Sequence, residues 1–240
     1  MANWYIGKKA SIGKNVLMGN NVTIYGDCQI SDNCIIGDNV SIGFPSREEL
    51  RFFRPKSRKG SPCDIDSLSR NHTCIGKRVK ILSNSVVYSG VSIGNDTEIF
   101  EHTRIGPGTS IGEKCRVRYG AQIYTDVTIG NNCIVGGFTC SRAKIGSDCT
   151  MMGNMVHKYD KGWIDGLKEA APIMEDHVIV AYNALLVGNI KVSRYVYIAA
   201  GAIVTKNIPS RSIVVGNCRI CDAREWKGKL DFGVVFKLRR

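Results

Sequence analysis

An aliphatic residue returns at every sixth position through the middle of this chain. The run contains Ile75, Ile81, Val87, Ile93, Ile99, Ile105, Ile111, Val117, Ile123, Ile129 and Val135. A period of six fits neither the 3.6-residue turn of an α-helix nor the alternation of a free strand, and it is typical of a repeat solenoid. We predict an all-β parallel β-helix in which each hexad is one strand and one corner. Three hexads close a coil, the aliphatic side chain points inward, and coils stack ~4.8 Å apart.

The same register predicts the extent of the solenoid. A first block runs from Ile6 to Ile42, and a last block runs from Met174 to Val204. The central block slips by two residues near residues 140–144, and its next hexad is expected to begin at His157. Together the blocks predict about eight coils.

Two stretches lack the register and are predicted as insertions, at about residues 44–74 and 157–172. We expect one β-helix domain over residues 1–217. Residues 218–240 are expected to form a tail with a short helical turn and a strand.

The first insertion contains prolines and a basic run, and residues 48–53 are predicted to form a short helical turn. A loop of this length inside a compact domain is usually functional or disordered. Three interpretations remain open: a solvated excursion, an arm over the acceptor site of a neighbouring subunit, and a contact with nucleic acid. The basic residues are Arg51, Arg54, Lys56, Arg58 and Lys59.

Composition narrows the partners. The formal net charge of +12 favours binding partners that carry several negative charges. The basic residues are scattered and form no recognisable nucleic-acid module, so we expect a phosphorylated cofactor or substrate rather than nucleic acid. No apolar run approaches the ~20 residues that span a bilayer, and the first residues resemble no secretory signal. A cytoplasmic protein without membrane insertion is expected.

The chain has 10 cysteines, and most of those in the solenoid occupy the small position of a hexad. We expect reduced thiols that fill space in the core. Cys218 and Cys221 form a lone C-x-x-C motif, which is weak support for zinc without a second pair. No metal is therefore expected.

The last third of the chain resembles the hexapeptide-repeat acyltransferases, in particular sugar O- and N-acetyltransferases and xenobiotic acetyltransferases. A histidine, an irregular loop and two sequence runs carry the resemblance: Ala-Pro-Ile-Met-Glu-Asp-His-Val-Ile-Val-Ala-Tyr-Asn-Ala-Leu-Leu from residue 171, and Ala-Ala-Gly-Ala-Ile-Val-Thr-Lys-Asn-Ile-Pro-Ser-Arg-Ser-Ile-Val-Val-Gly-Asn from residue 199. The resemblance implies a left-handed β-helix and a homotrimer with sites between subunits. It also implies direct transfer of an acetyl group from acetyl-CoA to a hydroxyl or amine of a sugar. Nucleotide-linked sugars, polysaccharide precursors and sugar-containing antibiotics are all open as acceptors.

The resemblance implies that His157 is the general base, because it matches the histidine before the loop. An acceptor hydroxyl or ammonium must lose a proton before it attacks a thioester, and imidazole has a pKa near neutrality. Asp160 is a candidate for orienting the imidazole. A backbone N–H of the next coil is the expected partner of the tetrahedral oxyanion.

The resemblance also implies a coenzyme A groove. The positions that match it, or that offer small side chains and cations nearby, are Tyr182, Ala199, Ala200, Gly201, Thr205, Lys206, Arg211 and Arg219. Two departures matter: Tyr182 is bulky where the pattern has a small residue, and the sequence after Gly216-Asn217 lacks the usual proline, which weakens the assignment of Arg219.

Three further residues are candidates for substrate binding: Glu101, His102 and Arg54. The Glu101–His102 pair resembles a motif of sialic-acid-type acetyltransferases, but its offset from the next Ile-Gly differs. His102 is therefore an alternative to His157 as the base, or a corner histidine that is bonded locally.

Two other functions stay open. A non-catalytic β-helix scaffold would bind no coenzyme A. A γ-type carbonic anhydrase has the same fold, but it needs three histidines, two of them five residues apart, and the spacings of His72, His102, His157 and His177 supply no such pair.

Overall fold

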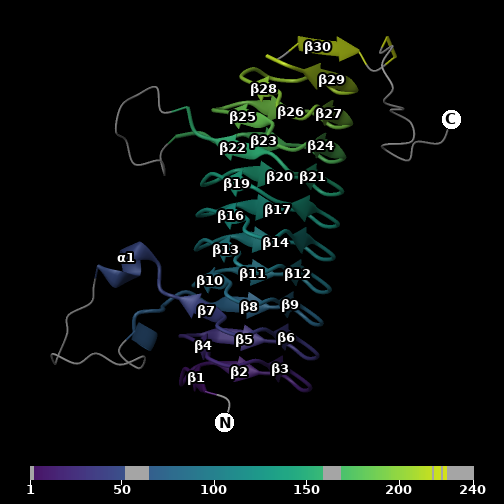
Figure 1. Ribbon diagram of the computed structural model, residues 1–240. Helices are drawn as coiled ribbons and strands as arrows, with labels where there is room; N and C mark the ends of the chain where they lie inside the picture. The colour runs from purple at the N-terminus through teal and green to yellow at the C-terminus, as the bar shows by residue number, and fades with distance from the viewer. Residues whose placement is uncertain (1–2, 52–64, 159–168, 218, 223, 226–240) are drawn as a thin grey trace.

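The computed structural model describes residues 3–51, 65–158, 169–217, 219–222 and 224–225 of the 240-residue chain. The chain winds as a left-handed parallel β-helix with three flat sheets (Figure 1). The β-helix has ten coils, and each contributes one strand to the first sheet. The sequence register therefore predicted the fold, and it undercounted the coils.

The three sheets receive one strand from each coil in turn. The first sheet contains β1 (Trp4–Ile6), β4 (Val22–Ile24), β7 (Ser41–Phe44), β10 (Val86–Tyr88), β13 (Arg104–Ile105), β16 (Gln122–Ile123), β19 (Phe138–Thr139), β22 (Asn154–Val156), β25 (Leu185–Val187) and β28 (Ile203–Val204). The second sheet contains β2 (Ser11–Ile12), β5 (Cys28–Ile30), β8 (Thr73–Ile75), β11 (Ser92–Ile93), β14 (Ser110–Ile111), β17 (Thr128–Ile129), β20 (Lys144–Ile145), β23 (Ile173–Met174) and β26 (Lys191–Val192).

The third sheet also carries the C-terminal strand. It contains β3 (Leu17–Met18), β6 (Ile35–Ile36), β9 (Lys80–Ile81), β12 (Glu98–Ile99), β15 (Arg116–Val117), β18 (Ile134–Val135), β21 (Thr150–Met151), β24 (Val178–Val180), β27 (Val196–Ile198), β29 (Ser212–Val215) and β30 (Arg219–Asp222). All pairs are parallel except β29 with β30, which is antiparallel. The predicted closing strand after residue 226 lies outside the described residues.

The core is a stack of inward aliphatic side chains in register. Ile105 pairs with Ile123 in the neighbouring coil, and both are fully buried. In most hexads after the first coil, the small residue two positions before the inward residue is buried as well, and where it is polar its side chain can bond to the next coil. Thr97 donates to the carbonyl of Gly112 at 2.9 Å, and the thiol of Cys133 donates to the carbonyl of Gly146 at 3.0 Å. The described cysteines are free thiols.

The register slips earlier than the sequence predicted. The inward residue after Val135 is Thr139, only four positions later, because the corner at Gly136–Gly137 is two residues short. A second short corner makes Met155 the inward residue after Met151. His157 therefore does not begin a hexad; it follows β22 at a corner.

Helix α1 (Arg47–Leu50) lies in the first insertion and overlaps the helical turn predicted over residues 48–53. Among the described residues no helix is long and apolar enough to cross a bilayer.

Candidate active site

Both insertions leave the β-helix at the same edge. The first joins β7 to β8 and the second joins β22 to β23, so each leaves where the chain passes from the first sheet to the second. Figure 1 shows the described ends of both insertions on the same side of the prism, and we name this side the insertion edge. The strands β7 and β22 are five steps apart in the first sheet. At ~4.8 Å a step, the insertions leave the edge about 24 Å apart.

Helix α1 is fixed to this edge by one buried carboxylate. Oε2 of Glu49 accepts hydrogen bonds from the N–H of Ser46 and the hydroxyl of Ser89, both at 2.6 Å. Oε1 accepts from the N–H of Arg70 at 2.8 Å and from the amide of Asn71 at 3.2 Å. Ser89 belongs to the corner after β10, so Glu49 joins both ends of the insertion to the β-helix.

The hydrogen bonds to Glu49 also decide its charge. Burial raises the pKa of this carboxyl, but the bonds from Ser89 and from the N–H groups of Arg70 and Ser46 outweigh burial, so the pKa lies below its ordinary value. Glu49 is therefore ionised at neutral pH.

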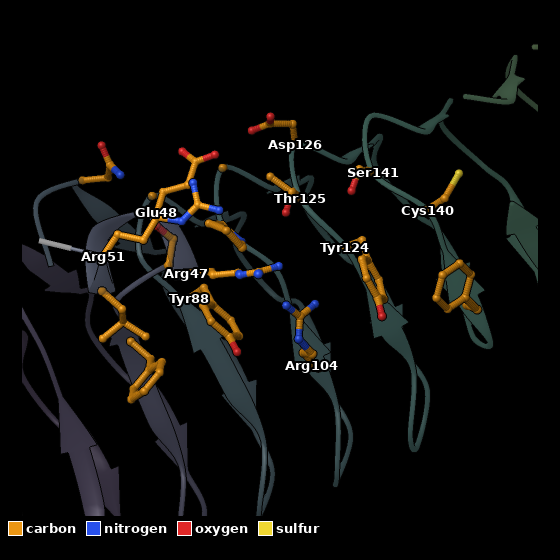
Figure 2. Close-up of a pocket in the computed structure, with 18 of the residues that line it drawn as sticks. Arg47, Glu48, Arg51, Tyr88, Arg104, Tyr124, Thr125, Asp126, Cys140 and Ser141 are labelled. Atoms are coloured by element: carbon orange, nitrogen blue, oxygen red, sulfur yellow. The ribbon is translucent and has the colours of Figure 1, made fainter. Parts of the chain in front are cut away.

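A groove runs along the insertion edge between α1 and the corners above it (Figure 2). One wall is α1, and the floor is formed by the first sheet and its corners. Among the lining residues are Arg47, Glu48 and Arg51 from α1, Tyr88, Arg104, Tyr124 and Phe138 at or beside the first sheet, and Thr125, Asp126, Cys140, Ser141 and His157 at the corners.

An arginine clamped between two tyrosines lies on the groove floor. The guanidinium carbon of Arg104 is 4.7 Å from the ring centroid of Tyr88 and 4.8 Å from that of Tyr124. The two tyrosines lie two coils apart, and Gly106 occupies the matching position in the coil between them. Nη1 of Arg104 donates to the carbonyl of Ile123 at 3.3 Å. Figure 2 shows the side chain of Arg104 between those of Tyr88 and Tyr124.

His157 lies at the far end of the groove from α1. It follows β22 directly and is only 6% exposed. Cys140 and Ser141 reach the groove from the preceding corner, where the N–H of Cys140 donates to the carbonyl of Met155 at 3.0 Å. The returning end of the second insertion is tied to this corner, because the guanidinium of Arg142 donates to the carbonyl of Glu169. Asp160, the candidate for orienting the imidazole, lies outside the described residues.

The alternative base His102 lies on another edge, where the chain passes from the third sheet to the first. Its backbone has a φ of 57°, its N–H donates to the carbonyl of Ser83 at 3.1 Å, and its ring meets Tyr119 edge-on at 5.4 Å. Neither His102 nor Glu101 lines the groove. Arg54 lies outside the described residues.

The positions suggested for coenzyme A are spread around the last coils. Tyr182 and the Ala199–Gly201 corner stack on the third-to-first edge, where the N–H of Gly201 donates to the carbonyl of Tyr182 at 3.0 Å. Thr205 and Lys206 follow β28 on the insertion edge, beyond His157.

Two more of these positions lie elsewhere. Arg211 is on the second-to-third edge, 5.9 Å from the ring centroid of Tyr195, and Arg219 begins β30. Within one chain these candidates form no single groove. Among the described residues no cluster of three or more His, Cys, Asp or Glu could hold a metal ion.

Sequence reasoning missed the clamped arginine. The sequence does contain a signal. Tyr88 and Tyr124 each come directly after an inward residue, they lie two coils apart, and in the coil between them the matching position is a glycine. A gap of this kind in an aromatic ladder leaves room for a planar cation from the same strand.

Known proteins share the repeat and the fold. The family model for the bacterial transferase hexapeptide (six repeats) matches residues 9–44 and 102–140. The bifunctional protein GlmU of Clostridium botulinum (strain Kyoto / Type A2) is 29% identical over 159 residues, which cover 62% of this chain and 34% of the relative. GlmU of Listeria welshimeri is 26% identical over 188 residues, covering 72% of this chain and 37% of the relative. The chain thus spans about a third of the length of these curated relatives.

A solved structure agrees with the fold along almost the whole chain. UDP-N-acetylglucosamine acyltransferase from Campylobacter jejuni superposes with a TM-score of 0.50 at 17% identity, covering 98% of this chain and 79% of that chain. At this identity the likeness concerns the fold.

Proposed function

From the matching hexapeptide repeats we infer that this chain is a member of the hexapeptide-repeat superfamily. We propose that it is an acyltransferase that moves an acetyl group from acetyl-CoA to an acceptor in the groove of the insertion edge. The observation that carries the proposal is the position of His157. His157 is buried at one end of a groove, and a helix of the first insertion forms the other end. The groove is large and polar enough for a sugar-type acceptor, and that class also fits the name of the UDP-N-acetylglucosamine acyltransferase with which the chain superposes.

His157 would act as the general base. It would take the proton from the acceptor hydroxyl or amine as that atom attacks the thioester carbonyl, and it would then give the proton to the departing thiolate of coenzyme A. The carbon–sulfur bond breaks as the new carbon–oxygen or carbon–nitrogen bond forms, so no covalent enzyme intermediate is required. No metal takes part in this scheme.

The tetrahedral oxyanion needs a hydrogen-bond donor near His157. In the next coil the N–H of Gly188 already donates to the carbonyl of Val156, and the N–H of Ile190 donates to the carbonyl of Gly188, both at 2.8 Å. The backbone N–H of Asn189, between them, is our candidate for the oxyanion.

For coenzyme A we propose a site between subunits of a homotrimer. The suggested residues Tyr182 and Ala199–Gly201 lie on one border of the first sheet, whereas Thr205 and Lys206 lie on its other border. Two such borders from neighbouring copies would make one groove beside His157. The use of acetyl-CoA would place the reaction in the cytoplasm.

The first test is calorimetric titration of acetyl-CoA into the wild-type protein, His157→Gln and the matched control His102→Gln. We expect binding of one acetyl-CoA per chain in all three. A screen of amino sugars and nucleotide-linked sugars should then give transfer that falls about 10²- to 10⁴-fold in His157→Gln, because a positioned general base is typically worth that factor. The His102→Gln variant should keep its rate.

Either of two results would reject the proposal. If the wild-type protein binds no acetyl-CoA, the chain is a scaffold rather than an acyltransferase. If His157→Gln transfers acetyl groups at the wild-type rate and His102→Gln does not, the base is His102 and the groove is not the acceptor site.

A further inference from the structure

We propose that Arg104 binds an anionic group of the acceptor, a phosphate or a carboxylate, and that this group lies about three coils from the atom that is acylated. The second half of this inference, the distance to the acylated atom, rests on the proposed function, because it assumes that acylation takes place at His157. Its first half, an anion site on the groove floor, stands on the contacts of Arg104 alone.

The contacts of Arg104 leave donors for a ligand. A guanidinium has five N–H donors in one plane. The rings of Tyr88 and Tyr124 flank the guanidinium on two sides, and one nitrogen donates to the carbonyl of Ile123. A ligand can therefore approach only the edge of the plane, which is the direction in which a guanidinium binds phosphate or carboxylate with two parallel hydrogen bonds.

Among the residues that the structure describes, no carboxylate is paired with this cation. None of the ion pairs between residues that the structure describes includes Arg104 or Arg47. Figure 2 shows Arg47 extending from α1 toward Arg104, whereas Glu48 and Asp126 lie at the rim of the groove. Two guanidinium groups thus face the same space, and an anion between them would relieve their repulsion.

The clamp also prepares Arg104 for binding. A free arginine loses rotamer freedom when it binds a ligand, at a cost comparable to one hydrogen bond. Stacking between two rings removes that freedom before the ligand arrives, and cation–π contacts hold the charge in place without using its N–H groups. Arg104 is therefore preorganised for an edge-on anion.

The β-helix fixes the distance from this site to the base. Arg104 is on β13 and His157 follows β22, and the strands β13, β16, β19 and β22 are consecutive neighbours in the first sheet. Three steps of ~4.8 Å place the anion about 14 Å from the reacting hydroxyl or amine. A free monosaccharide is too short to reach both points. The acceptor class that fits is a sugar extended by a phosphodiester or diphosphate, or an acidic oligosaccharide.

The test uses simple anions as probes, so that it does not depend on acyl transfer. Inorganic pyrophosphate represents the phosphate source and succinate represents the carboxylate source. Each is titrated at constant ionic strength into the wild-type protein, Arg104→Met and Arg104→Lys. The matched control is Arg116→Met, because Arg116 lies on β15 in the third sheet, outside the groove. Thermal midpoints establish that each variant is folded.

We expect the wild-type protein to bind at least one probe, and the stronger of the two identifies the acceptor anion. Arg104→Met should weaken binding by about tenfold or more, because a bidentate charge-assisted contact is lost, and Arg104→Lys should recover only part of it. Arg116→Met should bind as wild type does. Equal binding by Arg104→Met, or binding of neither probe by the wild-type protein, overturns the anion site.

The two proposals fail in different ways. If acetyl-CoA does not bind but pyrophosphate binding depends on Arg104, the acyltransferase proposal fails and the anion site stands. If acetyl-CoA binds and His157→Gln loses transfer while Arg104→Met keeps the wild-type KM for every acceptor, the enzyme stands and the inference about its acceptor is wrong.

Discussion

Replacing Glu49 by Gln should release helix α1 from the insertion edge and leave the β-helix intact. The carboxylate accepts four hydrogen bonds, two on each oxygen, from Ser46, Ser89, Arg70 and Asn71. A glutamine keeps the shape of the side chain but offers one oxygen and an NH₂ group. The hydroxyl of Ser89 or the amide of Asn71 can turn to accept from that NH₂, whereas a backbone N–H cannot.

The structure gives the size of the effect. Whichever way the amide turns, the N–H of Ser46 or that of Arg70 loses its acceptor, and an unsatisfied buried donor costs about 1–3 kcal/mol. The remaining bonds change from charged to neutral, at a loss of about 1 kcal/mol each. Removal of a buried charge offsets part of this. We expect docking of α1 to weaken by about 3 kcal/mol, which is roughly a hundredfold in the docking equilibrium.

Hydrogen exchange measures this equilibrium directly. The N–H groups of Leu50 and Arg51 donate to the carbonyls of Ser46 and Glu48, at 2.9 and 3.2 Å, so they exchange when α1 opens. Their exchange should accelerate about a hundredfold in Glu49→Gln, while the N–H of Arg104 in the core should not change.

The matched control is Glu48→Gln on the same helix, whose side chain is exposed. It should exchange as wild type does. An acceleration below threefold in Glu49→Gln, or an equal acceleration in both variants, would refute the anchoring role of Glu49.

Two further predictions concern pH and the core. Because the pKa of Glu49 is lower in the folded chain than in the unfolded one, its contribution is present above the ordinary glutamate pKa of ~4.3 and is lost as the pH falls through the folded-state pKa. After correction for intrinsic rates, exchange of α1 should therefore accelerate below about pH 4 in the wild type and show no such step in Glu49→Gln; a step in both would mean that another group titrates. Replacing the fully buried Ile105 by Ala should lower the free energy of unfolding by about 2–5 kcal/mol in denaturant titrations. Ile203→Ala, at a side chain that is 40% exposed, should cost only about 1–1.5 kcal/mol, and equal costs would contradict the inward register.

The sequence predicted the fold because the inward aliphatic residue, one in every six, reveals the repeat. An inward Ile or Val must recur wherever a strand crosses a face of the prism, so the period alone identifies the solenoid. The coil count was wrong for a specific reason. At Gly136–Gly137 and Met152–Gly153 the corners are two residues short, and Thr139 and Met155 then take the inward position. A search for aliphatic residues at a fixed period of six passes over both.

Of the residues that line the groove, the sequence singled out only His157 as a candidate for catalysis. His157 stood out because it precedes a loop in a resembling sequence, and whether it is the base remains a prediction. The groove could not be predicted, because it depends on contacts between residues far apart in sequence. Glu49 reaches Ser89 across 40 positions, and Arg104 reaches Tyr124 only because the coil length brings them together. Such contacts follow from which edge each insertion leaves, and hexad counting gave no information on that.

The shared edge explains how a regular scaffold can make one specific site. Every separation along the first sheet is a whole number of strand steps, so the positions of Arg104 and His157 are fixed by hydrogen bonds between coils rather than by the insertions. Helix α1 depends on one carboxylate for its docking, whereas the floor residues are part of the sheet and its corners. Loss of α1 should therefore weaken acceptor binding without moving the base. Under our proposals, Glu49→Gln would raise the KM for the acceptor and leave kcat at saturating acceptor almost unchanged, and a fall in kcat alone would show that α1 positions His157 after all.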